Sequence, residues 1–457
     1  MPYHTGSRNR GKGMTAMILP PYVAECISAL ENAGYQAWCV GGCVRDHCLG
    51  LQPSDFDLCT SALPEQTEAV FSQYSLVLAG KKHGTVGVVT GGTVVEITTF
   101  RTEGAYRDNR HPDWVCFVPQ VEADLARRDF TINSIAWSPH RGFADPFGGR
   151  NDLENRVLRA VGDPVQRFRE DSLRILRGIR FAVRFGLAVE PATFAAMESE
   201  AHLMSNLARE RVFEELCKLL PLVTAEDLLR FGPILAQVLP PLKDQLGFDQ
   251  HSPHHAYDLY THTAHVVAAV PGNLTLRWAA LLHDIGKIST FTLDDAGRGH
   301  FLGHAGESAR TADELLRQLK APNNLREQVT VLISHHMTKL PEDKKLLRRW
   351  LGRLGEESLD QLLLLQEADM GSKGTGKPAE MKQFPNIRRL LEEILAEYSC
   401  LSLKDLAVNG HDLIALGITG KAIGQTLNFL LEQVLDEQLP NHRDALLPAA
   451  MEFFKNE

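Results

Sequence analysis

The sequence predicts an α+β protein in which a small mixed α/β head precedes a long all-helical remainder. Two observations predict this class. Short β-branched runs broken by glycine are confined to residues 37–137, and such runs are typical of strands. After about Asp163 the apolar spacing becomes helical and stays so to the end of the chain. Strands first and helices afterwards indicate an α+β chain rather than alternating βαβ units.

The head contains four runs that we expect to be strands. They are Ala37–Val40, Asp55–Cys59, Thr85–Thr90 and Thr93–Phe100. Gly91 and Gly92 separate the last two runs and predict a tight hairpin. Beyond the head, Ser205–Leu220 and Leu390–Glu397 show the spacing of amphipathic helices.

Composition excludes several classes of protein. The chain has 457 residues, of which 44% are hydrophobic and 23% are charged, as in a soluble protein of about three domains. No window of 18 apolar residues occurs, so no membrane helix is expected, and the first residues lack a secretory core segment. A cytoplasmic location is therefore expected. The net charge is −9, but residues 127–184 hold 12 arginines, no lysine and 7 acidic residues, a local balance of +5. Arginine suits phosphates and base edges.

Two aspartates in the head predict a metal site. Asp55 and Asp57 stand at i and i+2 of an expected strand, so their carboxylates would share one face. Adjacent carboxylates repel one another, and oxygen-only ligation suits Mg²⁺ together with substrate phosphates. Gly42, in a Gly-Gly pair upstream, would let the backbone approach a triphosphate, and Arg45 would supply positive charge.

A third carboxylate lies in an apolar strand segment. Glu96 either faces the metals with Asp55 and Asp57 or points outward, and the sequence leaves both readings open.

An arginine stripe is expected on a later helix. At 100° per residue, Arg174, Arg177, Arg180 and Arg184 fall on one arc, with Asp171 at its edge. The opposite arc is aliphatic and is expected to be buried. We therefore expect the helix to display its arginines.

These motifs follow one another in an order that resembles a known family. The chain reads GGxVRD, DxD, RRDFTxN, DPFGG, EDxxRxxRxxRF and, from Glu210 onward, ERxxEEL. This order resembles the class II tRNA nucleotidyltransferases, which include the CCA-adding enzymes and poly(A) polymerases. The resemblance implies that Asp55 and Asp57 are catalytic Mg²⁺ ligands. It also implies nucleotide contacts from a set comprising Gly42, Arg45, Arg128, Asp171, Arg174, Arg177 and Arg180.

Within that set, Asp171 and Arg174 are expected to read the base. A carboxylate accepts from an exocyclic amino group, and an arginine donates to ring nitrogen or carbonyl acceptors. Cytosine and adenine both offer an amino group beside an acceptor, whereas guanine and uracil present the opposite pattern. Such a pair would accept C and A without a nucleic-acid template.

A second constellation is expected further along the chain. The pattern H…HD…H…HH…D resembles the HD phosphohydrolase superfamily. The expected ligands of a divalent metal of unknown identity are His262, His283, Asp284 and Asp369, joined by His304 and His335. A decayed site kept as a scaffold for RNA is the alternative.

The expected organisation has five segments. They are a lead-in at 1–17, a nucleotidyltransferase head at 18–163, a helical neck binding nucleotide and RNA at 164–244, an HD domain at 245–375 and a helical tail at 376–457.

The resemblance implies addition of C, C and A to the 3′ end of tRNA from CTP and ATP, with tRNA as the partner, no membrane and no protein partner. The alternatives are an A-only or CC-only enzyme, a poly(A) polymerase, or an HD phosphohydrolase with a vestigial head. The loop Arg101–Pro112 looks complete, which disfavours CC-only addition.

Overall fold

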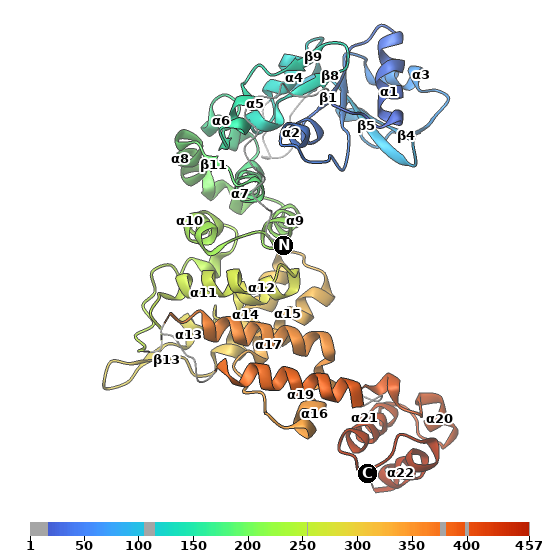
Figure 1. Ribbon diagram of the computed structural model, residues 1–457, viewed down its shortest axis with the longest axis vertical. Coiled ribbons are helices and arrows are strands. Elements are labelled where there is room, and N and C mark those ends of the chain that lie inside the picture. The colour runs from blue at the N-terminus through green and yellow to red at the C-terminus, as the bar shows by residue number, and fades with distance from the viewer. Residues whose placement is uncertain (1–16, 105–114, 254, 375–380, 398–401, 457) are drawn as a thin grey trace. The chain divides into compact units, whose positions relative to one another are not determined.

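The computed structural model describes residues 17–104, 115–253, 255–374, 381–397 and 402–456. The chain forms two compact units, which meet between Leu219 and Leu220 (Figure 1). The expected α+β class is confirmed. The main sheet lies in the first unit, and the described part of the second unit is helical apart from one two-stranded ribbon. The five-segment division stays a prediction, and most of the expected lead-in lies outside the described residues.

The first unit is built on a seven-stranded sheet with the order β3-β4-β5-β2-β1-β8-β9. Its strands are β1 (Ala37–Val40), β2 (Leu58–Thr60), β3 (Ser75–Val77), β4 (Thr85–Thr90), β5 (Thr93–Thr99), β8 (Ala136–Ser138) and β9 (Gly142–Ala144). β2 runs parallel to β5, and the other neighbouring pairs are antiparallel. The parallel register sets Leu58 opposite Ile97, so the residues just before them are also brought together.

The expected hairpin between β4 and β5 is confirmed. Thr90 pairs with Thr93, and the two residues between them are Gly91 and Gly92. Their φ angles are 57° and 78°, and a tight turn of this kind requires positive φ at both central residues. Glycine adopts that region without the steric cost that a side chain would bring.

Helices and short strands surround the sheet. They are α1 (Pro21–Asn32), α2 (Gly42–Cys48), α3 (Pro64–Val70), α4 (Val121–Ala126), α5 (Gly149–Glu154), α6 (Pro164–Glu170), α8 (Pro191–Glu200), β6 (Arg101–Glu103), β7 (Val115–Phe117), β10 (Val157–Leu158) and β11 (Ala188–Val189). Trp38, Val40, Phe100 and Leu125 share one buried cluster, which fixes β1 against the chain around α4. The end of β1 is therefore held firmly where α2 begins.

Two further helices complete the first unit, α7 (Leu173–Phe185) and α9 (Arg209–Leu219), and they pack against one another. The aliphatic face of α7 is buried as expected, with Ile175, Leu176 and Ile179 at most 1% exposed. The helix ends at Gly186, whose φ of 61° is the left-handed conformation common at helix C-termini.

The second unit is a helical array. Its elements are α10 (Ala225–Leu235), α11 (Leu259–Ala269), α12 (Leu274–Leu282), α13 (Lys287–Thr290), β12 (Thr292–Leu293), β13 (Gly299–His300), α14 (His304–Gln318), α15 (Asn323–His335), α16 (Lys344–Leu354), α17 (Glu356–Gly371), α19 (Gln383–Glu397), α20 (Gly410–Ala415), α21 (Lys421–Leu435) and α22 (Arg443–Asn456). α17 packs against α11, α12 and α15, so it closes the core in which these helices meet.

The last three helices have a core of their own. Leu413, Leu430 and Leu446, from α20, α21 and α22, are fully buried in one cluster. Among the described residues, none of the helices has the length and apolar character needed to cross a bilayer.

Candidate active site and histidine cluster

Three carboxylates gather at the start of β2 in the first unit. Asp55 and Asp57 precede the strand rather than lying in it, because the observed strand begins at Leu58. The carbonyl of Asp57 accepts from the amide of Val40 at 3.0 Å, which ties this segment to the end of β1. Glu96 is exposed on β5 next to Ile97, and the parallel register therefore sets it beside Asp57.

The electrostatics of Asp57 show the crowding of negative charge. Its pKa is raised to about 6, first by desolvation from the surrounding protein and then by the charges of Asp55 and Glu96, whereas Arg128 opposes the rise. The side chain itself remains exposed, so solutes can reach it. The carboxylates of this cluster repel one another and are open to solution. Such a cluster fits a divalent cation, which prefers oxygen ligands.

The turn into α2 brings the backbone close to this cluster. Gly41 has a φ of 74°, and a Cβ at this position would lie 3.0 Å from Nη1 of Arg128. Gly42 is the first residue of α2. Arg128 keeps a buried Nε without a hydrogen-bond partner among the described residues, and its Nη2 donates to Asp124 at 3.5 Å.

The buried side chain of Arg45 is held by contacts with other residues of the chain. It is 6% exposed, and it donates to Asp46 at 2.8 Å and to Asn133 at 2.7 Å. Its guanidinium also lies over the rings of Phe181 and Phe185, at 5.3 and 4.6 Å from their centroids. This arginine thereby links α2 to α7.

The Arg-Arg-Asp motif is joined to α7 by an ion pair. Arg177 donates to Oδ2 of Asp129 from Nε at 2.9 Å and from Nη2 at 2.8 Å. Burial alone would raise the pKa of Asp129, but Arg177 and the amide of Asn133 outweigh it and lower the value to about 2. Asp129 is therefore a carboxylate that fixes Arg177 in place.

Asp171 and Arg174 each have an opposite charge as a partner. Asp171 accepts from Nη2 of Arg211 at 2.8 Å and from Nη1 at 3.4 Å. Arg174 donates from Nη1 to Glu170 at 2.7 Å and from Nη2 to the carbonyl of Arg127 at 3.2 Å.

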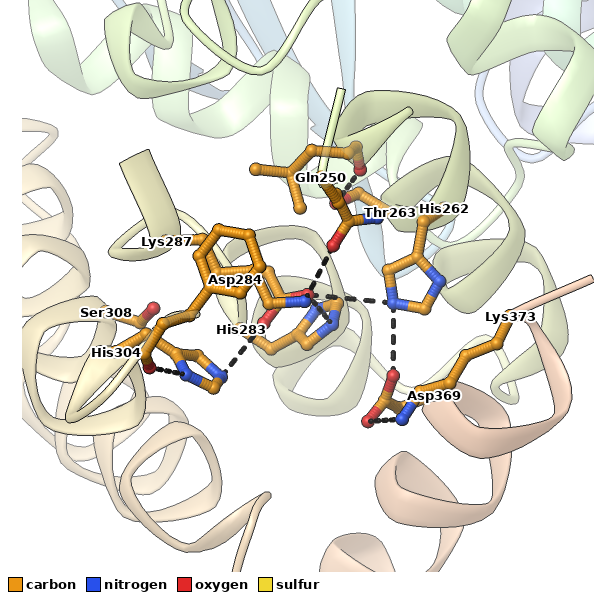
Figure 2. Close-up of polar contacts among 12 residues, drawn as sticks. Gln250, His262, Thr263, His283, Asp284, Lys287, His304, Ser308, Asp369 and Lys373 are labelled. Atoms are coloured by element: carbon orange, nitrogen blue, oxygen red, sulfur yellow. Dashed lines mark hydrogen bonds and ion pairs between the residues drawn. The ribbon is translucent and has the colours of Figure 1, made fainter. Parts of the chain in front are cut away.

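In the second unit, four histidines surround Asp284. Figure 2 shows three of them, His262, His283 and His304. The Nε2 atoms of His283 and His262 lie 3.1 and 3.6 Å from Oδ2 of Asp284. Those of His304 and His336 lie 3.3 and 3.6 Å from its Oδ1. Two groups of ligand atoms, one for each carboxylate oxygen, are compact enough to hold a metal, since each spans no more than 4.8 Å.

The protonation pattern of these rings follows from their second nitrogens. Each Nδ1 faces a backbone carbonyl at 2.6–3.3 Å, so that nitrogen carries the proton. For His262, His283, His304 and His336 the carbonyls belong, in that order, to Ser372, Ala280, Phe301 and Ile333. All four Nε2 atoms are buried and form no hydrogen bond with the residues that the structure describes. Metal-binding histidines are oriented in this way.

Further charges complete the cluster. Asp369 lies 3.1 Å from Nε2 of His262, and Lys373 is 3.8 Å from the same carboxylate (Figure 2). Nζ of Lys287 lies 2.7 Å from Asp284. A pocket of about 240 Å³ opens beside these residues and is lined in part by both lysines.

The pKa shifts in the cluster favour a bound cation. Burial alone would raise the pKa of Asp284, but His283 and Lys287 hold it well below its usual range. Burial alone would lower the pKa of His283, yet Asp284 and Asp369 raise it. The buried anions thus attract positive charge, which a metal ion would supply.

Comparisons with known proteins agree with the geometry of the first unit. Residues 37–159 match the family described as the Poly A polymerase head domain, 186–245 the probable RNA and SrmB-binding site of polymerase A, and 300–450 the tRNA nucleotidyltransferase domain 2. The CCA-adding enzyme of Levilactobacillus brevis is 35% identical over 432 residues, which cover 93% of this chain and 95% of the relative. The chain belongs to the CCA-adding enzyme family.

Other members of the CCA-adding enzyme family match over similar lengths. The relative from Geobacillus thermodenitrificans is 32% identical over 95% of this chain and 97% of its own length. The crystal structure of the Bacillus stearothermophilus CCA-adding enzyme in complex with CTP is 27% identical, has a TM-score of 0.64, and is matched over 96% of this chain and 99% of that one.

Several expected site residues of this CCA-adding enzyme family member lie where the sequence did not place them. Asp171 is not on the helix with Arg174, because its backbone is extended, with φ −144° and ψ 102°, between α6 and α7. The arginine stripe is only partly displayed. Arg174 and Arg180 are 8% and 7% exposed, and Arg180 forms a 2.6 Å ion pair with Glu215 of α9.

The histidine cluster contains His336 rather than the expected His335. The ring of His335 instead packs edge-on against Trp350, 5.2 Å between centroids. The sequence carried a signal for this choice. Val329, Leu332 and Ile333 are buried on α15, and a helical period of 3.6 continues from them to position 336.

In the Gly-Gly pair, which was expected to let the backbone approach a triphosphate, it is Gly41 that has the special backbone conformation next to Arg128. One residue of this family member was missed as a site residue. Arg211 was noted within a motif but given no role, although it contacts Asp171. Its signal in the sequence was its place in the ERxxEEL motif.

Proposed function

We propose that this chain adds C, C and A to the 3′ end of tRNA from CTP and ATP, without a template. The observation that carries this proposal is the match to CCA-adding enzymes over 93% of the chain, together with the three carboxylates at the start of β2. In the reaction the 3′-hydroxyl of the tRNA attacks the α-phosphate of the nucleotide, and pyrophosphate leaves.

Asp55 and Asp57, with Glu96 beside them, would hold two Mg²⁺ ions. When bound, such ions lower the pKa of the attacking hydroxyl and neutralise the charge that develops on the triphosphate. The residues support this role because their carboxylates face solution, and because desolvation and the charges of Asp55 and Glu96 together raise the pKa of Asp57. Arg128, with a buried Nε that no described residue engages, is placed to meet an anionic nucleotide.

The bases would be read by Asp171 and Arg174. Asp171 would accept from the amino group of C or A, and Arg174 would donate to the neighbouring acceptor. Arg177 would help to hold the nucleotide from the same helix. Arg45 and Arg180 would act indirectly, since both are buried in ion pairs that fix α2 and α7 in place.

The function is tested on a tRNA that lacks its last three nucleotides. With all four nucleoside triphosphates present, sequencing of the products should show C, then C, then A, and no further addition. A substrate that already ends in CC should gain one A. Failure to extend the shorter tRNA while the CC-ending tRNA gains A would indicate an A-only enzyme. A run of adenosines would indicate a poly(A) polymerase. Most of the loop at 101–112 lies outside the described residues, so the expectation that this loop disfavours CC-only addition stays a prediction. Products that end in CC and gain no A in the same experiment would contradict it.

A second activity is favoured by the histidine cluster. The cluster would bind a divalent metal through His262, His283, His304, His336, Asp284 and Asp369, since all four Nε2 atoms are buried and point at carboxylate oxygens without a hydrogen bond to the described residues. Lys287 and Lys373 line the adjacent pocket, and such a site would suit hydrolysis of a phosphate ester. This activity would accompany nucleotide addition, because the carboxylates of the first unit argue against a vestigial head.

Adjacent histidines give a matched pair of variants for this site. His336→Ala should weaken metal binding at least about tenfold to a hundredfold, the loss that even indirect changes at metal sites produce. His335→Ala should leave it unchanged. Chelator-treated full-length protein is titrated with Co²⁺, whose visible spectrum reports nitrogen ligation, and nucleotide addition should persist in both variants. Equal Co²⁺ affinity in the two variants would contradict a metal site at this cluster.

A further inference from the structure

The helix α9 contacts the residues proposed to read the base. Arg211 donates two hydrogen bonds to the carboxylate of Asp171, at 2.8 and 3.4 Å. One turn later, Glu215 accepts from Nε of Arg180 at 2.6 Å. Residues four apart share one face of a helix, so a single face of α9 contacts both the extended residue between α6 and α7 and the middle of α7.

The two proposed base readers are held in equivalent ways. Glu170 accepts from Arg174 at 2.7 Å, and Arg211 donates to Asp171 at 2.8 Å. Each reader therefore forms an ion pair with an oppositely charged side chain. Glu170 directly precedes Asp171 in the chain, whereas Arg211 comes from 40 residues away.

The carboxylate of Asp171 keeps room for a ligand. Its Oδ1 accepts from the amide of Leu173 at 3.0 Å and from Arg211, while its Oδ2 accepts from Arg211 alone among the described residues. A carboxylate oxygen has two lone pairs, so Oδ2 can accept one more hydrogen bond. The side chain is 15% exposed, so the carboxylate is not sealed off from solution.

We propose that Arg211 is a positioning residue for base selection. The terminal torsion of an aspartate is soft, so an unpaired carboxylate would rotate and present its lone pairs in many directions. The forked guanidinium fixes the plane of the Asp171 carboxylate, and the second lone pair of Oδ2 then meets the amino group of C or A in one orientation. This inference rests on the proposed reading of the base by Asp171.

The rigidity of α9 makes this role specific. Arg211 cannot follow a displaced carboxylate freely, because Val212 and Leu216 of the same helix are fully buried and the Arg180–Glu215 pair anchors the next turn. The position of Asp171 is thus set by a packed helix rather than by a mobile side chain. A wrong base, which cannot donate at that point, would meet a carboxylate that does not adapt.

The test measures incorporation of each of the four nucleotides by the full-length enzyme. Asp171→Ala is the reference and should lower the preference for C and A over U and G by about 10- to 100-fold. Arg211→Gln should lower this preference by about tenfold and raise the KM for CTP and ATP, with kcat at saturating nucleotide largely kept. Arg211→Lys should lie between Arg211→Gln and the wild type, since one ammonium cannot replace a fork.

Controls separate positioning from other roles. Arg209→Gln on the same helix, whose side chain bonds to the carbonyl of Ser205, should change nothing. In the Asp171→Ala background, Arg211→Gln should add no further loss of selectivity. An added loss there would mean that Arg211 touches the base itself, which overturns the proposal. Melting temperatures are measured for all variants, and Arg211→Lys carries the test if Arg211→Gln does not fold.

Two further outcomes are distinguishable. If Asp171→Ala relaxes selectivity but both Arg211 variants keep it, the positioning role is overturned while base reading by Asp171 stands. If Asp171→Ala keeps full selectivity, base reading by Asp171 fails, and the role of Arg211 fails with it.

Discussion

Replacement of Asp57 by alanine is expected to abolish nucleotide addition while the protein remains at least as stable as the wild type. Loss of a metal ligand removes several kcal/mol of transition-state stabilisation, and each ~1.4 kcal/mol is tenfold in rate, so kcat should fall by at least about a thousandfold. Stability should not fall, because the pKa of Asp57 is raised to about 6. Above that pH Asp57 is ionised in both states. In the folded protein, desolvation and the neighbouring carboxylates disfavour this charge, whereas in the unfolded chain they do not.

The measurement combines single-turnover incorporation of CTP with a thermal melt at pH 7.5. Glu65→Ala is the matched control, because this exposed carboxylate lies on α3 and pairs with Lys81 at 3.5 Å, apart from the cluster. Glu96→Gln should slow the reaction if this residue shares the metals. Retained activity in Asp57→Ala would show that the chemistry lies elsewhere.

Replacement of Arg180 by alanine is expected to cause the largest loss of stability. Arg180 and Glu215 are nearly fully buried and lie 2.6 Å apart, so removal of the arginine leaves a buried carboxylate that has only the exposed Lys218, at 3.7 Å, as a cationic partner among the described residues. Breaking such a pair costs about 3–5 kcal/mol. For a unit of this size that corresponds to a fall of roughly 10 °C in the melting temperature.

Two variants sharpen this test. Arg184→Ala changes an exposed arginine of the same helix and should leave the melting temperature unchanged. The double variant Arg180→Met with Glu215→Leu should regain most of the stability, because apolar replacement of both partners removes the unpaired charge. An Arg180→Ala enzyme that melts normally but binds CTP and ATP weakly would instead place this arginine on the nucleotide.

The sequence predicted well what depends on neighbours along the chain. The Gly91–Gly92 turn and the aliphatic face of α7 are local patterns, and both were found as expected. The burial of Arg45 and Arg180 could not be predicted, because their partners, Asn133 and Glu215, lie 88 and 35 residues away. A charge pattern along one helix cannot show what packs against it.

The break before α7 illustrates a second limit. Asp171 is extended although no proline or glycine interrupts the run from Glu170 to Arg174, so periodicity carries through it without a signal. The choice of His336 over His335 as the cluster residue could have been predicted, because the spacing of the buried positions of α15 leads to position 336.

The ion pair from Asp129 to Arg177 and the contact of Arg45 with Phe185 also set the order in which the first unit can be completed. The sheet begins at Ala37, but β1 lies between β2 and β8, and α2 is held by a helix that ends at Phe185. Such a topology has high contact order, which slows folding. During synthesis, when domains fold as units from the N-terminus, the emerging sheet must wait for about a hundred and fifty further residues before the arginines and carboxylates of its site are fixed. Until then its unpaired strand edges are open to capture by other chains.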